Sequence, residues 1–584
     1  MLDGAITRIV RSGEVDLALV QAGDRGRPAL IFIHGYPDTK ELWADVLARL
    51  APSYHVAAYD VRGAGDSSRP RRAAAYDLAR LGDDLEAVIE AVSPGRPVHL
   101  VGHDWGAIQG WEFVTQERFA GMLASLTAIA GPPLDQVIAA GNRLLRRPTP
   151  ARVAELARRA RRSWYIVAIF TPGVPTLAWR WLARGGRWNW LMQNLERVGT
   201  DGGHPAPTLA ADGRHGAKLY RRNIPRRLLG PRAHVVAHAP VQLVIPARDH
   251  YISTSYYDNA RLIAPVLRRR LVGARHWVPR TEPGLVAHWI GEFVDQVEAG
   301  SEAGSRTPWA RGGGIEQLCG RLALVTGAGS GIGRATAAAL CAQGARLLLV
   351  DRDRAALARA GEEIGAEGTF VCDVSDEQAM ERLADEVVCR FGVPDVVVNN
   401  AGIAVAGPFL ETTGQDWQRV VGVNLMGVVH GCRVFGRALV ERGEGGQIVN
   451  VASAAAFQPA KDLPAYSASK AAVMMASECL RAELAPYGIG VTAACPGFVS
   501  TNITRAAHYV GLPEAEERAL AERLTRLYER RNFGPERVAT AIVEAIGADL
   551  PVAVITPEAR VMRALSRFAP GVRRRLATLD TLPA

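Results

Sequence analysis

Several signatures of common protein classes are missing from this 584-residue sequence. All seven cysteines lie in the second half of the chain, and none forms a Cys-x-x-Cys pair, which argues against a disulfide framework and against a zinc site. The first residues lack the basic-then-apolar order of a signal peptide, and no apolar run approaches the roughly 18 residues of a membrane span. We therefore expect reduced thiols, no bound metal and a cytoplasmic protein.

The length of the chain exceeds what a single hydrophobic core fills, so we expect at least two domains. One stretch, residues 300–315, is rich in Gly, Ser and Ala and has the composition of a flexible linker. The parts on either side, residues 1–299 and 316–584, both alternate apolar strands with helical patterns, and neither contains an internal repeat. The predicted fold class is therefore α/β, with two doubly wound domains.

The most informative stretch of the first half is VHLVGHDWGAIQGWEF, residues 98–113. It combines an apolar strand, a Gly-x-x-x-Gly turn and an amphipathic helix, and it places Asp104 at the apex of the turn, where many hydrolases carry a serine nucleophile. Two further stretches precede it, ALIFIHGYPDTKELW and HVAAYDVRGAGDSSRP, and each is an apolar strand that runs into a loop. In this order the motifs resemble the epoxide-hydrolase and haloalkane-dehalogenase branch of the α/β-hydrolase superfamily, over about the first 298 residues.

Chemistry at saturated carbon explains a carboxylate at this apex. Asp104 is ionised at pH 7 and needs no base to displace a strained C–O bond or a C–halogen bond, which leaves an alkyl ester. A histidine must then activate the water that hydrolyses this ester. The resemblance implies His276 in that role and Asp249 as its orienting acid, although Arg275 stands where the family often has glycine. It assigns the oxyanion hole to the backbone N–H groups of Tyr36 and Trp105.

The leaving group decides between an epoxide and a halide. A halide needs N–H donors, and Tyr36 occupies the position from which dehalogenases often take their second donor beside Trp105. An epoxide oxygen needs proton donors, and the resemblance implies two tyrosines of a helical cap at about residues 131–235, Tyr165 in SWYIVAIFTPGVP and Tyr220 in AKLYRRNIP. We expect epoxide opening, with a dehalogenase as the alternative. The many tryptophans of the cap suit a bulky apolar epoxide, such as that of a lipid.

The second half opens with a glycine-rich pattern, RLALVTGAGSGIGRATAAALCAQGARLLLVD. A strand, a glycine turn, a helix and a second strand of this kind bind dinucleotides in a Rossmann fold. Six further motifs follow in this order: VCDV, VVVNNAG, VVGVNLMG, IVNVAS, AYSASK and ACPGFVST. The whole series resembles the short-chain dehydrogenase/reductase (SDR) family over about residues 318–545. The implied cofactor-binding residues are Gly327, Ser330, Gly331, Ile332, Gly333, Asp351, Asp373, Asn400, Ala401, Gly402, Tyr466, Lys470, Pro496, Gly497 and Thr501.

The same series contains a complete catalytic set. Tyr466 and Lys470 stand one helical turn apart, so the ammonium can lie beneath the phenol and lower its pKa toward working pH. The family implies that Ser453 hydrogen-bonds the substrate oxygen and that Asn424 holds a water between Lys470 and solvent. This set predicts oxidation or reduction of a secondary alcohol or ketone. A nucleotide-binding scaffold is the alternative.

The cofactor is predicted to be NAD. Asp351 ends the second strand, where a carboxylate accepts the ribose hydroxyls and repels a 2′-phosphate. Ser330 stands in the turn in place of Arg or Lys, which agrees with NAD. Arg352 follows Asp351 directly and could meet a phosphate, so NADP stays open.

The net charge of +10 is concentrated in two arginine-rich stretches, NRLLRRPTPARVAELARRARRSW in the cap and ARVMRALSRFAPGVRRRLATL near the C-terminus. Both are predicted as amphipathic helices with solvated faces, and docking on an anionic membrane, at its inner face, is the alternative. No nucleic-acid-binding module is present, and the resemblance implies a homo-oligomer formed through the SDR domain. We predict a bifunctional enzyme that hydrolyses an epoxide to a diol and interconverts a secondary alcohol and ketone, on related or unrelated substrates.

Overall fold

A computed structural model of the chain describes residues 4–138, 164–199, 204–230, 232, 235–300, 309–501, 503 and 505–578. The chain divides into two compact units, residues 1–307 and 308–584. Part of the predicted linker and nearly all of the arginine-rich stretch of the cap lie outside the described residues. No helix in the described ranges is long and apolar enough to cross a membrane.

The first unit is built on an eight-stranded sheet of order β1-β2-β4-β3-β5-β6-β7-β8. The β1–β2 hairpin is antiparallel and β2 is antiparallel to β4, whereas the other neighbouring strands are parallel. The central strands are buried on both faces, as parallel strands between two helical layers must be. The strands are β1 (Ile6–Ser12), β2 (Val15–Ala22), β3 (Ala29–Ile33), β4 (His55–Tyr59), β5 (Val98–His103), β6 (Leu123–Ile129), β7 (Val241–Pro246) and β8 (Leu267–Val272).

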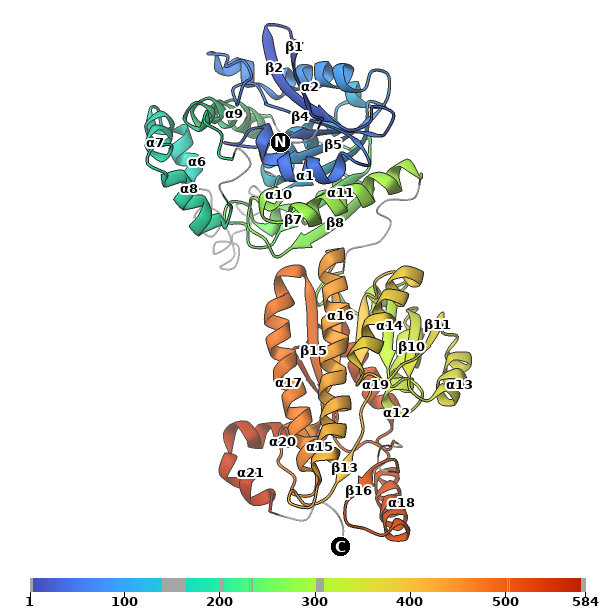
Figure 1. Cartoon of the computed structure of the whole chain (residues 1–584). Helices are drawn as coiled ribbons and strands as arrows, with labels where there is room; N and C mark the ends of the chain where they lie inside the picture. The colour runs from blue at the N-terminus through green and yellow to red at the C-terminus, as the bar shows by residue number, and fades with distance from the viewer. Residues whose placement is uncertain are drawn as a thin grey trace. The chain divides into compact units, whose positions relative to one another are not determined.

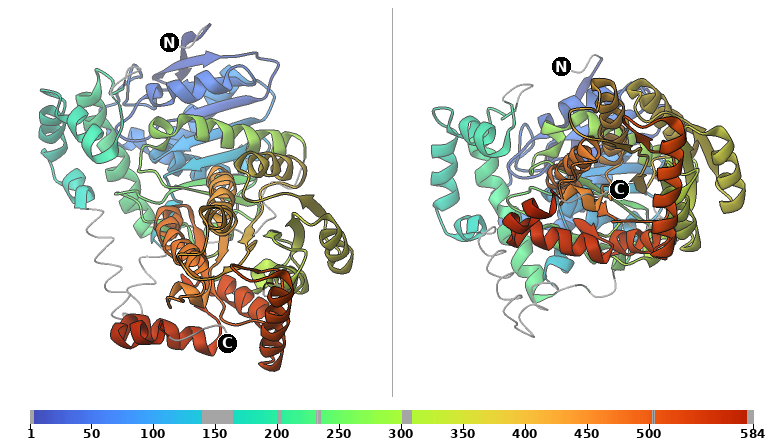
Figure 2. Two further views of the ribbon diagram at one scale, coloured as in Figure 1. Left: turned by 60° about the horizontal axis from the view of Figure 1, so that its bottom comes forward. Right: turned by 90° about the horizontal axis from the view of Figure 1, so that it is seen from below.

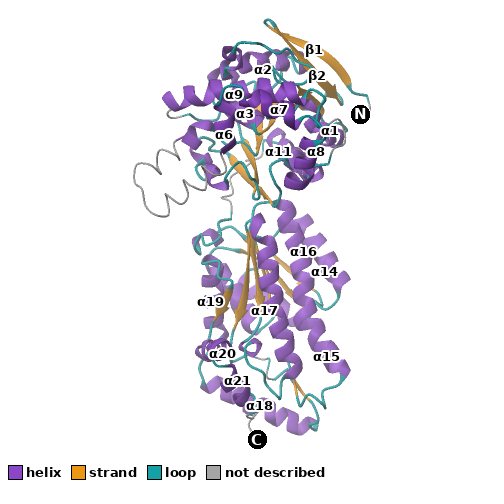
Figure 3. Ribbon diagram, turned by 90° about the vertical axis from the view of Figure 1, so that its left-hand side faces the viewer, coloured by secondary structure: helices purple, strands orange, loops and turns teal. Residues whose placement is uncertain are grey.

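Helices cover both faces of this sheet (Figure 1). One apolar cluster packs the sheet against α2 and α3, and a second packs its other face against α1 and α11. Figure 3 shows the same layers with the strands enclosed by helices. The helices of this core are α1 (Ala44–Leu50), α2 (Leu78–Val92), α3 (Trp105–Val114), α10 (Val278–Thr281) and α11 (Pro283–Glu298).

The predicted cap is an insertion between β6 and β7. Its helices lie to one side of the sheet, and Figure 2 shows them in turquoise and green. The described elements are α6 (Trp164–Phe170), α7 (Val174–Leu182), α8 (Arg187–Leu191), the π-helical turn η4 (Met192–Glu196) and α9 (Leu209–Leu229).

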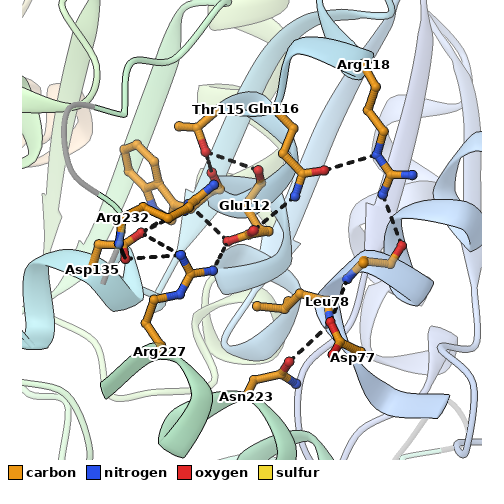
Figure 4. Close-up of polar contacts among 12 residues, drawn as sticks. Asp77, Leu78, Glu112, Thr115, Gln116, Arg118, Asp135, Asn223, Arg227 and Arg232 are labelled. Atoms are coloured by element: carbon orange, nitrogen blue, oxygen red, sulfur yellow. Dashed lines mark hydrogen bonds and ion pairs between the residues drawn. The ribbon is translucent and has the colours of Figure 1, made fainter. Parts of the chain in front are cut away.

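Buried polar contacts fasten α9 to the core (Figure 4). Arg227 pairs with Glu112 of α3 at 2.6 Å and with Asp135 at 3.2 Å. The Asn223 side-chain oxygen accepts the backbone N–H of Leu78, at the start of α2, at 3.1 Å. Because such charges are largely buried, losing one partner would leave the other uncompensated. The cap is therefore held at a defined position over the carboxyl ends of the strands.

The second unit is a seven-stranded parallel sheet of order β11-β10-β9-β12-β14-β15-β17. The order reverses between β9 and β12, which is where such folds open a ligand crevice. The strands are β9 (Leu322–Thr326), β10 (Arg346–Asp351), β11 (Gly368–Val371), β12 (Val396–Asn399), β14 (Gly446–Val451), β15 (Ile489–Cys495) and β17 (Val552–Val554).

Two helical layers enclose this sheet as well. One apolar cluster includes α12, α13 and α19, and the other includes α14, α16 and α17. The π-helical turn η8 (Gly422–Met426) joins α15 to α16. The helices are α12 (Gly331–Ala342), α13 (Arg354–Ile364), α14 (Glu377–Phe391), α15 (Gly414–Val421), α16 (Gly427–Arg442), α17 (Pro464–Leu484), α18 (Glu514–Arg530), α19 (Pro535–Gly547), α20 (Pro557–Phe568) and α21 (Pro570–Leu576).

Candidate active sites

The candidate nucleophile Asp104 lies in the turn between β5 and α3. Its backbone has a φ of 51° and a ψ of −118°, a strained conformation for a residue other than glycine. The turn also needs Gly106, because a Cβ at that position would lie 2.1 Å from the carbonyl oxygen of Ile33. The Tyr36 backbone N–H donates to Asp104 Oδ1 at 2.9 Å. The turn thus presents the carboxylate beside one of the two predicted oxyanion donors.

His276 and Asp249 lie next to this carboxylate. His276 Nδ1 is 2.8 Å from Asp249 Oδ2 and His276 Nε2 is 3.6 Å from Asp104 Oδ2. The other oxygen of Asp249 accepts the backbone N–H groups of Tyr251 and Ile252 at 2.7 and 2.9 Å. Burial lowers the pKa of His276, but the charges of the two carboxylates and their hydrogen bonds outweigh burial and hold that pKa well above its usual value.

The two predicted cap tyrosines approach the same point from different helices. Tyr165 lies on α6 and Tyr220 on α9, with their ring centroids 6.3 Å apart. The Tyr220 ring packs against Trp105 at 4.8 Å and against Tyr36 at 5.3 Å. Burial, and then the charge of Asp104, raise the pKa of both cap tyrosines. Both hydroxyls therefore keep their protons at neutral pH.

A buried carboxylate of the cap was not predicted from the sequence. Glu196 in η4 is 1% exposed, and its Oε2 accepts the backbone N–H of His276 at 3.2 Å. Its Oε1 is 3.1 Å from His250 Nδ1. Arg275, the departure from the family pattern, donates to the carbonyl of Leu195 in the same turn. The cap and the histidine loop therefore hold each other in place, and no local motif signals this.

Asp38 makes a second contact that sequence reasoning missed. Its carboxylate accepts the Trp277 indole N–H at 2.9 Å and lies 2.8 Å from His204 Nε2 of the cap. Asp38 directly follows the H-G-x-P stretch, and Trp277 directly follows His276. The sequence offered only one indication of this contact, the position of Asp38 next to the H-G-x-P stretch, because Trp277 and His204 are far from Asp38 in the sequence.

A cavity of about 430 Å³ lies at the carboxyl ends of the strands in the second unit. Every predicted cofactor-binding residue except Gly333 contributes to its lining, and Ser453 does so too. Gly333 lies directly behind the turn, where a Cβ would be 2.1 Å from the carbonyl oxygen of Gly327. The dispersed motifs of the second half therefore meet around one cavity.

The glycine turn forms an end of this cavity that fits a dinucleotide. Ser330 precedes α12, and its side chain makes no capping hydrogen bond. The first N–H groups of the helix, which favour an anion, are thus not occupied by that hydroxyl. Asp351 Oδ2 accepts the backbone N–H of Gly329 at 2.8 Å, which orients the carboxylate at the end of β10. Arg352 lines the cavity beside it.

Ser453, Tyr466 and Lys470 meet at the other end. Tyr466 hydrogen-bonds Ser453, and Lys470 Nζ lies 5.8 Å from the Tyr466 ring centre while it donates to the carbonyl of Val451 at 2.9 Å. Burial lowers the pKa of Lys470 to about 8. Burial also raises the pKa of Tyr466, and the hydrogen bond with Ser453 offsets this only in part. The pKa of Tyr466 is therefore raised, and not lowered by Lys470 as the sequence predicted.

Asn424 lies in η8 and is buried. Its Oδ1 accepts the backbone N–H of Ile403 at 2.8 Å, and its Nδ2 donates to the Ile403 carbonyl at 2.9 Å and to Ser469 Oγ at 3.3 Å. The side chain is therefore engaged in fixing the loop after β12. Its predicted role in holding a water for Lys470 stays a prediction.

Comparison with known proteins covers both units. The family model described as alpha/beta hydrolase fold matches residues 28–163, and the model described as short chain dehydrogenase matches residues 321–509. The "Probable oxidoreductase EphD" of Mycobacterium tuberculosis is 38% identical over 590 residues, which cover 99% of each chain. The chain belongs to the EphD family. The resemblance and the fold class predicted from the sequence are thereby confirmed for both halves.

Other relatives match the SDR half of this EphD-family chain. Galactitol 2-dehydrogenase (L-tagatose-forming) of Cereibacter sphaeroides is 43% identical over 194 residues, 32% of this chain and 76% of that enzyme. A short-chain dehydrogenase/reductase from Burkholderia phymatum, crystallised in complex with NAD, is 34% identical and covers 46% of this chain and 98% of its own, with a TM-score of 0.40. The EphD-family chain is thus a bifunctional enzyme, and its SDR half takes a nicotinamide cofactor and a small alcohol or ketone.

Proposed function

We propose that the hydrolase half opens apolar epoxides to vicinal diols. The observation that supports this most strongly is the approach of Tyr165 and Tyr220 from the cap to the Asp104 carboxylate, with His276 Nε2 at 3.6 Å from that carboxylate. A nucleophile, a base and two proton donors are the groups that opening an epoxide through an ester requires.

The reaction follows two steps. In the first, an Asp104 oxygen attacks a ring carbon, the C–O bond of the epoxide breaks, and a cap tyrosine gives its proton to the departing oxygen. In the second, His276 takes a proton from water, the hydroxide attacks the ester carbonyl, and the diol leaves. The backbone N–H groups of Tyr36 and Trp105 stabilise the oxyanion of this step. The tyrosine regains its proton from His276, and one water is consumed for each diol.

The charge of Asp104 decides when His276 can act as a base. In the free enzyme the charges of Asp249 and Asp104 hold the pKa of His276 well above its usual value, which favours the protonated ring. Ester formation removes the charge of Asp104, which lowers the pKa of His276, so the ring can give its proton to the tyrosinate left by ring opening and Nε2 can then accept a proton from water. The base thus becomes active only after the ester has formed.

A dehalogenase is the alternative, and one contact weighs against it. A halide would need the indole N–H of Trp105 as a donor. The Trp105 ring packs against the ring of Tyr220, with the ring centroids 4.8 Å apart. The indole therefore lies beside a candidate proton donor for an epoxide oxygen.

Replacing both cap tyrosines by phenylalanine tests this assignment. We expect the Tyr165→Phe and Tyr220→Phe double variant to lose most of the roughly 10²–10⁴-fold that a general acid contributes. On a logarithmic scale, the loss of rate in each single variant should be less than half of the loss in the double variant, because the remaining hydroxyl still donates a proton. Diol formation from a terminal epoxide measures the effect.

Tyr36→Phe is the matched control. The Tyr36 hydroxyl donates to the Gly213 carbonyl at 2.9 Å and accepts from Trp179 Nε1 at 2.5 Å, so it is engaged away from the reacting carbon. We expect this variant to retain epoxide opening. Undiminished opening by the double variant would rule out the two tyrosines as proton donors, and rapid halide release by the parent enzyme would move the assignment to a dehalogenase.

For the SDR half we propose NAD-dependent interconversion of a secondary alcohol and a ketone. A nicotinamide cofactor held in the cavity beside Ser453 and Tyr466 would accept or supply the hydride. In the oxidation, Tyr466 takes the hydroxyl proton of the substrate while Ser453 holds the substrate oxygen, and Lys470 stabilises the phenolate that accepts this proton. The direction of hydride flow follows the supply of substrates.

The cofactor preference is proposed to follow Asp351. We expect the parent enzyme to use NAD at least about thirtyfold better than NADP, because its carboxylate would face the 2′-phosphate. Asp351→Ser removes the repulsion and leaves Arg352 to meet the phosphate, so the ratio should fall at least about tenfold. Values of kcat/KM for both cofactors measure it, with Asp353→Ser, two residues away, as a control. A parent enzyme that prefers NADP would contradict the proposal.

The two halves are proposed to act in sequence. Hydrolysis of an epoxide yields a vicinal diol, which is a substrate class for the SDR half, and the product is a hydroxyketone. Unrelated substrates, or an SDR half that serves only as a scaffold, are the alternatives. We also propose that the domains span residues 1–299 and 316–584 and are joined by a linker at residues 300–315. The same proposal includes a cytoplasmic location, an oligomer formed through the SDR half, and contact with an anionic membrane.

A further inference from the structure

The last two helices, α20 and α21, expose a row of apolar side chains. We call residues 557–576 the C-terminal helix pair. Val561 and Phe568, two helical turns apart on α20, are 58% and 79% exposed, and Val572 and Leu576, one turn apart on α21, are 50% and 40% exposed. The pair lies at the edge of the second unit (Figures 1 and 3). Clustered exposed apolar side chains of this kind mark a surface that contacts something other than water.

The charge of the helix pair has one sign. It contains six arginines, Arg560, Arg563, Arg567, Arg573, Arg574 and Arg575. Its single acid is Glu558, which is turned toward the protein: one oxygen accepts the backbone N–H of Phe498 at 2.9 Å and the other lies 3.2 Å from Arg531. Four of the arginines, Arg560, Arg567, Arg574 and Arg575, are exposed. The outer surface of the pair is therefore both apolar and strongly cationic.

The helix pair borders the dehydrogenase cavity. Met562 of α20 lines that cavity, and so does Gln458, whose side-chain N–H donates to the Arg573 carbonyl at 3.2 Å. The helix α20 also contacts the turn that follows Ser453. Beyond the catalytic residues the lining is largely apolar, with Ala406, Leu463, Ala507, Leu524 and Met562. A ligand that docks on the helix pair is therefore next to an apolar substrate cavity.

We propose that the C-terminal helix pair docks on an anionic lipid surface, from which the SDR half takes an apolar alcohol. The apolar side chains would enter the boundary between headgroups and acyl chains, and the arginines would meet the lipid phosphates. A second copy of the chain fits less well, because a two-fold contact would bring the same arginines against each other. The docking is supported by this surface alone. Only the second part of the proposal, that the SDR half takes an alcohol from the lipid, depends on the function proposed above.

Flotation of the full chain with vesicles tests the docking. We expect binding to phosphatidylcholine vesicles that contain phosphatidylglycerol, little binding to phosphatidylcholine alone, and loss of binding at high salt. Phe568→Gln with Val572→Gln should weaken binding at least about tenfold, because two apolar side chains are removed from the contact. Leu410→Gln, at another exposed leucine of the second unit, is the matched control and should bind as the parent does.

A second measurement separates docking from catalysis. The Phe568→Gln, Val572→Gln variant should oxidise a water-soluble secondary alcohol with unchanged kcat and KM, and lose at least about tenfold in kcat/KM only for a long-chain diol presented in anionic vesicles. Equal kcat/KM for the vesicle-borne diol in variant and parent would overturn the delivery step. A parent that oxidises neither alcohol would refute the proposed SDR function, while flotation still decides the docking.

Three results would overturn the docking itself. The first is failure of the parent to float with anionic vesicles. The second is loss of flotation in Trp181→Gln with Trp190→Gln, two exposed tryptophans of the cap, but not in the helix-pair variant, which would place the contact on the cap. The third is a change of oligomeric state in the helix-pair variant by analytical ultracentrifugation, which would make the pair an interface between copies.

Discussion

The His276→Gln variant, treated with an epoxide, is expected to accumulate as a covalent ester on Asp104. The nucleophile and the cap tyrosines remain, so the ring still opens, but no base activates the water that would release the diol. Intact-protein mass spectrometry should show a gain of one substrate mass, and peptide mapping should place it on Asp104. Asp104→Asn, without a nucleophilic carboxylate, should lose about 10⁴-fold or more in diol formation and show no adduct.

His238→Gln provides the control for a change of histidine to glutamine. His238 lies away from the site, beside Glu117, so this variant should turn over without a lasting adduct. An unmodified His276→Gln protein under conditions where the parent hydrolyses the epoxide would rule out the ester mechanism. A parent that hydrolyses none of a series of epoxides of graded chain length would reject the substrate class instead.

The intact protein supplied with an accepted epoxide and NAD is expected to form reduced cofactor after a lag. The lag reflects the diol, which the hydrolase half must make before the SDR half can oxidise it. Tyr466→Phe should reduce this signal by about 10²–10⁴-fold, because the group that exchanges the substrate proton is lost. Absorbance of the reduced cofactor measures both the lag and the rate.

The order of the two steps gives this experiment its control. Asp104→Asn should also abolish the signal from the epoxide, but adding the diol should restore it, whereas Tyr466→Phe should stay inactive with the diol. If the diol is never oxidised while other secondary alcohols are, the two halves work on separate molecules. Covalent fusion raises the local concentration of an intermediate only modestly, so separate work is a physically sound outcome.

The sequence was sufficient wherever a function is written in neighbouring residues. The turn around Asp104 and the glycine turn before α12 are short segments whose conformation depends on glycine and on an adjacent strand and helix. Tyr466 and Lys470 are related by helical geometry alone. The order of such segments along the chain was enough to predict both folds, which the family comparison confirms.

Several features could not be predicted because their partners are distant in the sequence. Glu196 contacts the backbone of His276 across 80 residues, and Asp38 contacts Trp277 across 239 residues. The side chain of Asn424 is bonded to Ile403, a contact that a motif cannot reveal. Burial depends on distant residues in the same way: the pKa of Tyr466 is raised because packing removes water from its side chain.

By itself, the sequence determined the fold class of both halves and which residue types could act as nucleophile, base, proton donor and cofactor ligand. Only the tertiary structure decided which of these side chains meet, how their pKa values shift, and that the apolar side of the C-terminal helix pair is exposed and not packed into a core. The reason is that local geometry follows from a few adjacent residues, whereas contacts and desolvation depend on how the whole chain packs.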